Sequence, residues 1–362
     1  MIPLVDLQAA HFEVAEEVEA GFKRIMANTA FIGGEEVAAF EREYAAFSGI
    51  AHCVGVANGT DALELALRAL EIGPGDEVIL PANTFIATAE AVARAGATPV
   101  LVDVDPDTYL IDTDAARSAV TAKTRAFAPV HLYGQMAPVE ALVGHGVPIV
   151  EDAAQCQGAT RHGRPPASFG PHGIAATSFY PGKNLGAYGD AGAVVTGDEA
   201  LATAVRRLSQ HGGLRKYEHD VMGVNSRLDA LQAVVLRAKL ARLAAWNELR
   251  RAAAARYDAL LEGLDVQKPS TLDGNVHVWH LYVIRVEERR DEIVAALNAA
   301  GIGAGIHYPI PVHLTGAFKQ YGKGSFPVAE QAAKEILTLP LYPQITASLQ
   351  ERVVSALADA LS

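Results

Sequence analysis

Cysteine is scarce in this chain of 362 residues, with Cys53 and Cys156 as its two copies. Two cysteines this far apart exclude a disulfide framework and a four-ligand zinc site. Their scarcity is typical of a protein of the reducing cytoplasm. The N-terminal stretch MIPLVDLQAAHFEVAEEVEAGF lacks the basic and apolar regions of a signal peptide. We therefore expect a cytoplasmic protein.

Long apolar runs and excess positive charge are also missing. No run reaches the roughly eighteen apolar residues that a membrane span needs. The formal net charge of −12 at pH 7 argues against a protein that wraps nucleic acid, although it is compatible with a small anion held by local donors. No G-x-G-x-x-G motif follows the first predicted strand, which disfavours an NAD-dependent enzyme.

What is present is a regular alternation of helical and strand patterns. The stretch EEVAAFEREYAAFSG predicts a helix that ends at Gly49, and AHCVGVANG predicts a strand that runs into a turn. Further along, APVEALVGHG predicts a helix and VPIVEDAAQ a strand. Single helices between strands indicate a mostly parallel sheet with helices on both faces. Ligands of such sheets bind at the carboxyl ends of the strands.

The pattern changes near Arg227. One or two long helices are predicted from there to about Gly263, and a smaller α/β unit follows. Half of the residues are apolar, which is enough for two lobes. We predict a large domain over residues 1–240 and a small C-terminal α/β domain over residues 241–362.

Several polar or aromatic residues follow the predicted strands. Gly59 and Thr60 stand where a strand meets a helix, a place that suits a phosphate, although Thr after Gly is also an ordinary helix cap. Phe85 follows another strand and could stack on a flat ligand or belong to the core. Glu151 and Asp152 end a third strand with Gln155 just beyond them. An acid there is either a surface-loop residue or helix cap, or a buried group that needs a cationic partner.

A lysine stands in the glycine-rich stretch TSFYPGKNLGAYGDAG. Lys183 is either a solvated loop residue or a covalent catalyst, because a lysine that binds an aldehyde must sit beside it and lose its proton readily. Ser178, five residues earlier, offers a hydroxyl to a phosphate. A phosphate cradle, an aromatic side chain, a strand-end Asp and a loop Lys together match the needs of pyridoxal 5′-phosphate (PLP), whose pyridine nitrogen pairs with an Asp.

The motifs ANGTDAL, GPGDEVILPANTFIATA, EDAAQ, SFYPGKNLGAYGDAG, GVNSRLDALQA and GIHYPIPVH resemble those of the DegT/DnrJ/StrS family of PLP-dependent sugar aminotransferases. The resemblance covers essentially the whole chain. It implies the fold of the fold-type I PLP enzymes, a homodimer with shared active sites, and Lys183 as the residue that binds PLP and moves protons. Some relatives have histidine in place of this lysine and act as sugar dehydratases, so the lysine favours transamination.

The resemblance also implies roles for the other residues. Asp152 pairs with the ring nitrogen, Gln155 lies near the ring hydroxyl and Phe85 stacks on the ring. The phosphate is bound by Gly59, Thr60 and Ser178, and by Asn225 of the other subunit. In some relatives the positions of Arg227, His307 and Tyr308 face a nucleotide sugar.

The expected reaction carries an amino group from L-glutamate to a nucleoside-diphosphate-linked keto-hexose, with pyridoxamine 5′-phosphate as the amino form of the cofactor. GIHYPIPVH resembles relatives that aminate carbon 3 rather than carbon 4 of the sugar. A keto-cyclitol acceptor and a non-catalytic regulatory protein are alternatives. We expect His131 and His211 to be structural, and the nucleotide, thymidine or uridine diphosphate, stays open.

Overall fold

Helices and strands alternate along most of the chain in the computed structural model, which describes residues 1–170, 172–322 and 324–362. The helices are α1 Leu7–Phe12, α2 Ala15–Asn28, α3 Glu35–Ser48, α4 Gly59–Ala69, α5 Ile86–Arg94, α6 Thr113–Ser118, α7 Glu199–Ser209, α8 Ala230–Leu260, α9 Arg290–Ala299, α10 Pro327–Glu335 and α11 Ala347–Leu361. The strands are β1 His52–Val56, β2 Glu77–Pro81, β3 Thr98–Val102, β4 Thr124–Phe127, β5 Val150–Asp152, β6 Thr160–Arg161, β7 Ile174–Ser178, β8 Gly192–Thr196, β9 Asn275–Val276, β10 Tyr282–Arg285 and β11 Ile336–Leu339. Short 3₁₀ turns occupy Leu132–Gly134, Val139–Ala141, Val312–Leu314 and Lys319–Tyr321.

The larger part of the molecule is built on a mixed sheet. Its strands pair in the orders β1-β8-β7-β5 and β3-β2-β4, and parallel bridges from Phe127 to Ile149 and from Val130 to Asp152 join β4 to β5. β8 runs antiparallel to β1 and β7, whereas the other pairs are parallel. The predicted, mostly parallel sheet is confirmed. The carboxyl ends of β1, β2, β5 and β7 therefore lie at one edge, where ligands bind in sheets of this kind.

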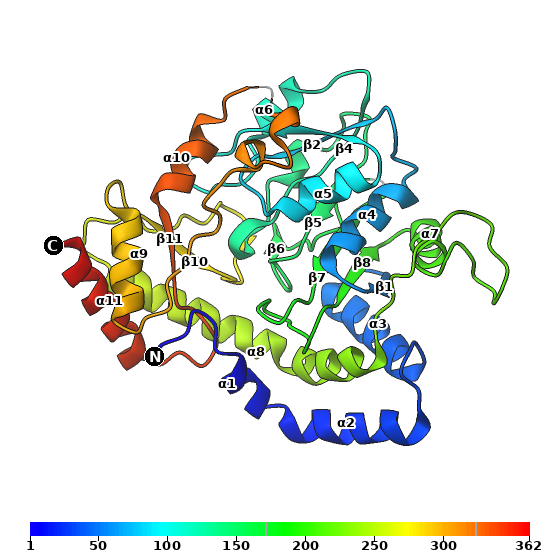
Figure 1. Cartoon of the computed structure of the whole chain (residues 1–362), viewed down its shortest axis with the longest axis horizontal. Coiled ribbons are helices and arrows are strands. Elements are labelled where there is room, and N and C mark those ends of the chain that lie inside the picture. The colour runs from blue at the N-terminus through cyan, green and yellow to red at the C-terminus, as the bar shows by residue number, and fades with distance from the viewer. Residues whose placement is uncertain (171, 323) are drawn as a thin grey trace.

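Both faces of the sheet are buried, because successive side chains of a strand point to opposite faces. Val78 and Leu80 of β2 pack in a cluster with α4 and α5, whereas Ile79 between them packs in a cluster with α3 and α8. Val150 of β5 belongs to the first cluster. Asp152, two residues on, shares its face, and Glu151 points to the other. Figure 1 shows α4 and α5 beside the sheet, and α3 and α8 below β1 and β7.

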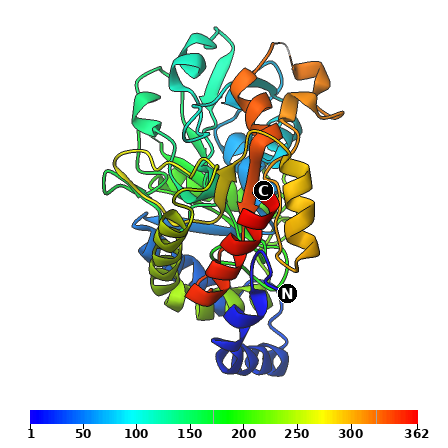
Figure 2. The same cartoon turned by 90° about the vertical axis from the view of Figure 1, so that its left-hand side faces the viewer.

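The long helix α8, 31 residues in one piece, leads from the sheet to the C-terminal unit. There β10 and β11 pair antiparallel and α9 and α11 pack beside them, as Figure 2 shows from the side. Ile2 joins the core of this unit, so the N-terminus lies against the C-terminal part. The division at residue 240 falls inside α8 and stays a prediction. No helix in the described ranges, α8 included, is long and apolar enough to cross a membrane.

Two features differ from the sequence-based expectation. The predicted helix over APVEALVGHG is wrong, since this stretch forms only the 3₁₀ turn Val139–Ala141. Pro138 precedes the turn, and Gly144 and Gly146 follow it with φ of 95° and 75°, a conformation that an α-helix does not contain. The alternation also did not reveal β7 and β8, the two strands between which the lysine loop lies.

Candidate active site

The N-terminus of α4 forms a cradle at the carboxyl edge of the sheet. The N–H groups of Gly59 and Thr60 lie in its first turn, where an α-helix supplies no acceptors. A Cβ on Gly59 would lie 2.6 Å from the Cβ of Ser178, and one on Gly192 would lie 2.5 Å from the carbonyl carbon of Asn58. Glycine is thus required at both places for this close approach. Free N–H groups, a helix N-terminus and a serine hydroxyl together suit a phosphate.

Asp152 ends β5 and is only 6% exposed. Its carboxylate accepts hydrogen bonds from Thr88 Oγ1 at 2.7 Å and from the Ala154 N–H at 3.1 Å. In the described part of the chain no arginine, lysine or histidine forms an ion pair with it. A buried carboxylate without a direct ion pair is costly, and the charge of Lys183 acts on Asp152 only from a longer distance. A protonated pyridine nitrogen is the kind of partner this site lacks.

Gln155 links two neighbouring segments. Its Oε1 accepts the backbone N–H of Tyr133 at 2.7 Å, and its Nε2 donates to the hydroxyl of Tyr308 at 3.1 Å. Tyr133 in turn donates its hydroxyl to the carbonyl of His307. These bonds attach the loop that carries His307 and Tyr308 to the end of β5.

Phe85 stands just before α5 with 51% of its surface exposed. Its ring centroid lies 5.3 Å from that of Tyr308, at 41°. Phe85 is therefore not a residue of the hydrophobic core. An exposed aromatic ring at this edge is available to stack on a flat ligand.

Lys183 follows β7 and is half-buried. Burial lowers the pKa of its amine to about 8, although the charge of Asp152 opposes this shift. His307 is neutral beside it, since burial and the charge of Lys183 lower the pKa of this imidazole to about 4. Its Nδ1 hydrogen-bonds to Thr338 Oγ1 at 2.8 Å. A lysine whose pKa is near 8 can act as a nucleophile or base near neutral pH.

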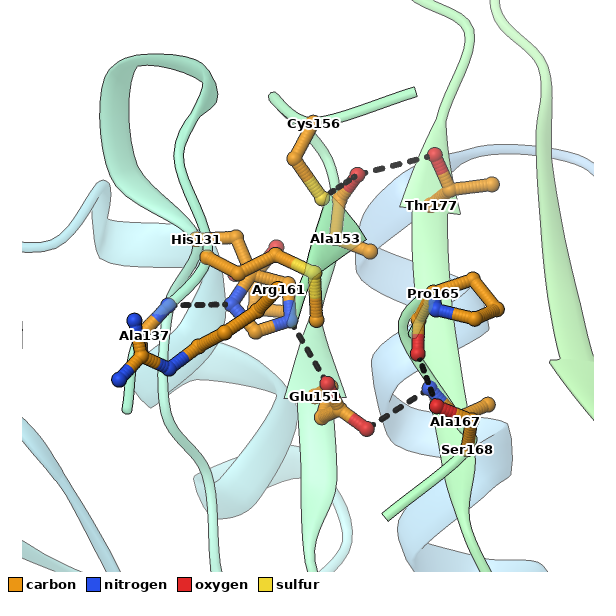
Figure 3. Close-up of polar contacts among 12 residues, drawn as sticks. His131, Ala137, Glu151, Ala153, Cys156, Arg161, Pro165, Ala167, Ser168 and Thr177 are labelled. Atoms are coloured by element: carbon orange, nitrogen blue, oxygen red, sulfur yellow. Dashed lines mark hydrogen bonds and ion pairs between the residues drawn. The ribbon is translucent and has the colours of Figure 1, made fainter. Parts of the chain in front are cut away.

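Glu151 and His131 lie on the other face of β5, both fully buried (Figure 3). The Ala137 N–H donates to His131 Nδ1 at 3.0 Å, so Nε2 carries the proton and donates to Glu151 Oε2 at 2.8 Å. The other oxygen of Glu151 accepts the Ala167 N–H at 2.7 Å. This pair ties the loops around β5 to the strand and does not reach the edge where Lys183 lies.

Asn225, Arg227 and His211 are not brought to this edge by any contact in the described ranges. The side chains of Asn225 and Arg227 are exposed on the segment before α8. The backbone of Asn225 bridges to Gln210, and that of His211 hydrogen-bonds to Val224.

Sequence reasoning missed two residues of the site. Thr88, 1% exposed, bonds to Asp152 across 64 positions of sequence, and no local signal marks it. Tyr133 follows the strand RAFAPV and stands in the polar stretch HLYG at its end. Asp152 is a candidate because it is a polar residue at the end of a predicted strand, and the same criterion applies to Tyr133.

Comparison with known proteins agrees with this geometry. The sequence pattern of the DegT/DnrJ/EryC1/StrS aminotransferase family matches residues 13–358. The chain is 46% identical to the UDP-N-acetyl-3-dehydro-alpha-D-glucosamine 3-aminotransferase of Acidithiobacillus ferrooxidans, over 99% of this chain and 98% of that one. It is 45% identical to a pleiotropic regulatory protein of Geobacillus stearothermophilus (99% and 98%) and 46% identical to the dTDP-3-amino-3,4,6-trideoxy-alpha-D-glucose transaminase of Streptomyces venezuelae (99% and 96%).

Solved structures show the same fold. The crystal structure of S. venezuelae DesV in complex with a ketimine intermediate superposes with a TM-score of 0.96 at 45% identity, covering 100% of this chain and 98% of that one. The structure of NtdA from Bacillus subtilis with bound cofactor PMP (pyridoxamine phosphate) superposes with a TM-score of 0.90 at 32% identity, covering 99% of this chain and 83% of that one.

Proposed function

The chain belongs to the DegT/DnrJ/EryC1/StrS aminotransferase family, and from this premise we propose that it transfers the amino group of L-glutamate to a keto-hexose linked to a nucleoside diphosphate. Glutamate leaves as 2-oxoglutarate, and the ketone carbon of the sugar becomes an amine. The observation that carries the proposal is the meeting of a phosphate cradle, a buried unpaired Asp152 and a lysine of lowered pKa at one edge of the sheet.

These residues fit PLP. The cradle of Gly59, Thr60 and Ser178 suits its phosphate, Asp152 its ring nitrogen and Phe85 its ring face. When bound, PLP carries the amino group and stabilises negative charge at the donor's α-carbon. Lys183 would hold the aldehyde of the cofactor.

The chain's own contribution to the reaction is the movement of protons. Lys183 Nζ would take the proton from the donor's α-carbon in its neutral form, and a pKa of about 8 gives it a far larger neutral fraction near physiological pH than an ordinary lysine has. Asp152 keeps a negative charge where the ring nitrogen binds, which favours the protonated ring. Thr88 and the Ala154 N–H orient that carboxylate.

We propose carbon 3 as the aminated position. The names of the transaminases of A. ferrooxidans and S. venezuelae both specify a 3-keto or 3-amino sugar, linked to UDP in the first and to dTDP in the second. His307 and Tyr308 stand at the site edge beside Phe85, and together with Arg227 they are our proposed contacts of the nucleotide sugar.

The proposed enzyme is a homodimer in which Asn225 of one subunit contacts the phosphate bound by the other. Exposed apolar side chains near Asn225 support this surface: Phe31, Ile32, Tyr217, Val221 and Met222. Ile32 bridges to Asp229, just after Arg227. Mixing an inactive Lys183→Ala protein with an inactive Asn225→Asp protein should restore activity in mixed dimers, because one site then has both residues. No recovery after subunit exchange contradicts the shared site.

Replacing Gly59 by alanine should raise the dissociation constant for PLP by about 10- to 100-fold. The new Cβ would meet the side chain of Ser178 at 2.6 Å and push apart the two walls of the cradle. Fluorescence titration of the apoprotein with PLP measures this. Gly197→Ala is the matched control, because nothing lies within 4 Å of its Cβ position. An unchanged dissociation constant for PLP in Gly59→Ala would contradict the assignment of the phosphate to this cradle.

The rate at which the apoprotein binds PLP covalently should rise with pH up to about 8 and then level off. Burial disfavours the charged amine of Lys183 and lowers its pKa to about 8, and only the neutral amine attacks an aldehyde. Below that pH the rate should rise about tenfold per pH unit. Stopped-flow absorbance follows the reaction. A rate that still rises above about pH 10, where an ordinary lysine titrates, contradicts the lowered pKa.

A panel of acceptors tests the proposed substrate. With L-glutamate as donor, 3-keto sugars on UDP and dTDP should be aminated at least about tenfold faster than 4-keto sugars and keto-inositols. A preference for 4-keto sugars or keto-inositols overturns the carbon-3 proposal. The name of the Geobacillus relative favours one other candidate, a regulatory protein without turnover. If the protein is such a regulator, it should bind PLP and aminate no acceptor of the panel.

A further inference from the structure

The lysine loop and the phosphate cradle are joined behind the site by a chain of buried amides. Asn184, next to Lys183, donates from Nδ2 to Asn247 Oδ1 at 3.1 Å. Asn247 donates from its own Nδ2 to the carbonyl of Gln157 at 2.9 Å. Gln157 donates from Nε2 to the carbonyl of Ser178 at 2.8 Å. The path thus runs from the residue beside the catalytic lysine to the serine of the cradle.

Each amide of this chain is held in place. Asn184, Asn247 and Gln157 are 4%, 3% and 2% exposed. Asn184 also donates to the Val278 carbonyl at 2.9 Å, and its Oδ1 lies 3.3 Å from His280 Nδ1. A buried amide with several hydrogen-bond partners is held in one orientation. The position of one partner therefore restricts the position of the next.

The centre of the chain is Asn247, in the interior of α8. Asn247 lies on this continuous helix, whereas Asn184 and Gln157 lie in loops. A side chain on a rigid helix that bonds to both loops sets the distance between them.

We propose that Asn247 is a positioning residue that fixes the lysine loop relative to the phosphate cradle, and that Gln157 carries its effect to Ser178. The inference rests on the proposed function, because both ends of the chain act on PLP. It concerns no new contact with the cofactor. Asn247 acts only through Asn184 and Gln157.

Three substitutions that roughly keep the size of the side chain separate the effect of Asn247 from that of Gln157 and from a general loss of stability. Asn247→Leu removes both of its bonds. Gln157→Met removes the three bonds that Nε2 donates, to the carbonyls of Ser178 and Ala154 and to Thr177 Oγ1, and keeps the bond from Asn247, which goes to the backbone of residue 157. Gln350→Met is the matched control: this amide is fully buried and bonds to the Ala253 carbonyl at 2.7 Å, in the C-terminal unit. All three should lower the Tm.

Two measurements tell positioning from stability, namely the dissociation constant for PLP and the pH midpoint of the bound cofactor's absorbance. Asn247→Leu should raise the constant at least about tenfold and move the midpoint by at least about half a pH unit. Gln157→Met should raise the constant and leave the midpoint in place. Gln350→Met should change neither.

The proposal is overturned if Asn247→Leu and Gln157→Met match Gln350→Met, with a lower Tm but wild-type values of both quantities. If Asn247→Leu does not fold, Gln157→Met decides, and an unchanged dissociation constant in that variant overturns the proposal. Failure of the wild-type protein to bind PLP would be a different result, which refutes the proposed function itself.

Discussion

Replacing Lys183 by alanine should abolish turnover, with a loss of about 10⁴-fold or more, while the protein stays folded. The amine of Lys183 both holds the cofactor and moves the proton, and general acid–base catalysis alone accounts for about 10²- to 10⁴-fold. The loop around it is fixed by neighbours such as Asn184, so its loss removes no core packing. Steady-state kinetics with L-glutamate measure the effect.

The same variant should bind PLP without a covalent bond. Treatment with sodium borohydride should add the mass of the cofactor to the wild-type chain and leave the Lys183→Ala chain unlabelled. Lys239→Met is the matched control, since burial lowers the pKa of Lys239 to about 8 as well, but its amine bonds to the Gly186 carbonyl. Turnover within tenfold of wild type in Lys183→Ala would remove this lysine from the mechanism.

Replacing Asp152 by asparagine should lower kcat by about 10²- to 10³-fold, the cost typical of removing one preorganised charge from an active site. Asparagine keeps the size of the side chain but loses the negative charge that favours a protonated ring nitrogen. Its oxygen can still accept from Thr88, so the fold should persist. Kinetics and the absorbance of the bound cofactor measure the two effects separately.

Glu151→Gln is the control for this experiment, because Glu151 is the neighbouring acid on the opposite face of β5. Its two oxygens accept from His131 and the Ala167 N–H, and an amide offers only one acceptor. We expect a loss of about 1–3 kcal/mol in the free energy of unfolding and an unchanged cofactor spectrum. Equal losses of kcat in the two variants, with the same spectrum, would contradict a special role for Asp152.

The sequence predicts the edge of the sheet better than the orientation of side chains at that edge. The apolar run that ends at Val150 is followed by both Glu151 and Asp152. The run itself does not show which of the two acids faces the site. Their faces follow from the pairing of β5 with β7 and from the cluster that holds Val150. Side-chain period and register together decide which acid faces the site.

Contacts between residues far apart in the chain could not be predicted from the sequence. Thr88 bonds to Asp152 and Gln155 to Tyr308 only because α5 and the C-terminal loop fold back on the sheet. The helix predicted over APVEALVGHG failed for a local reason, since its glycines adopt positive φ. The roles of Asn225 and Arg227 stay predictions, since both are exposed in the single chain.

The most direct test of the central claim is one absorbance spectrum of the purified protein with PLP, recorded before and after adding L-glutamate. The account predicts a visible band of the cofactor bound to Lys183, which glutamate replaces by the band of pyridoxamine 5′-phosphate. That single change would establish the cofactor, the lysine and the donor together. A protein that shows no cofactor band even with added PLP would contradict the account.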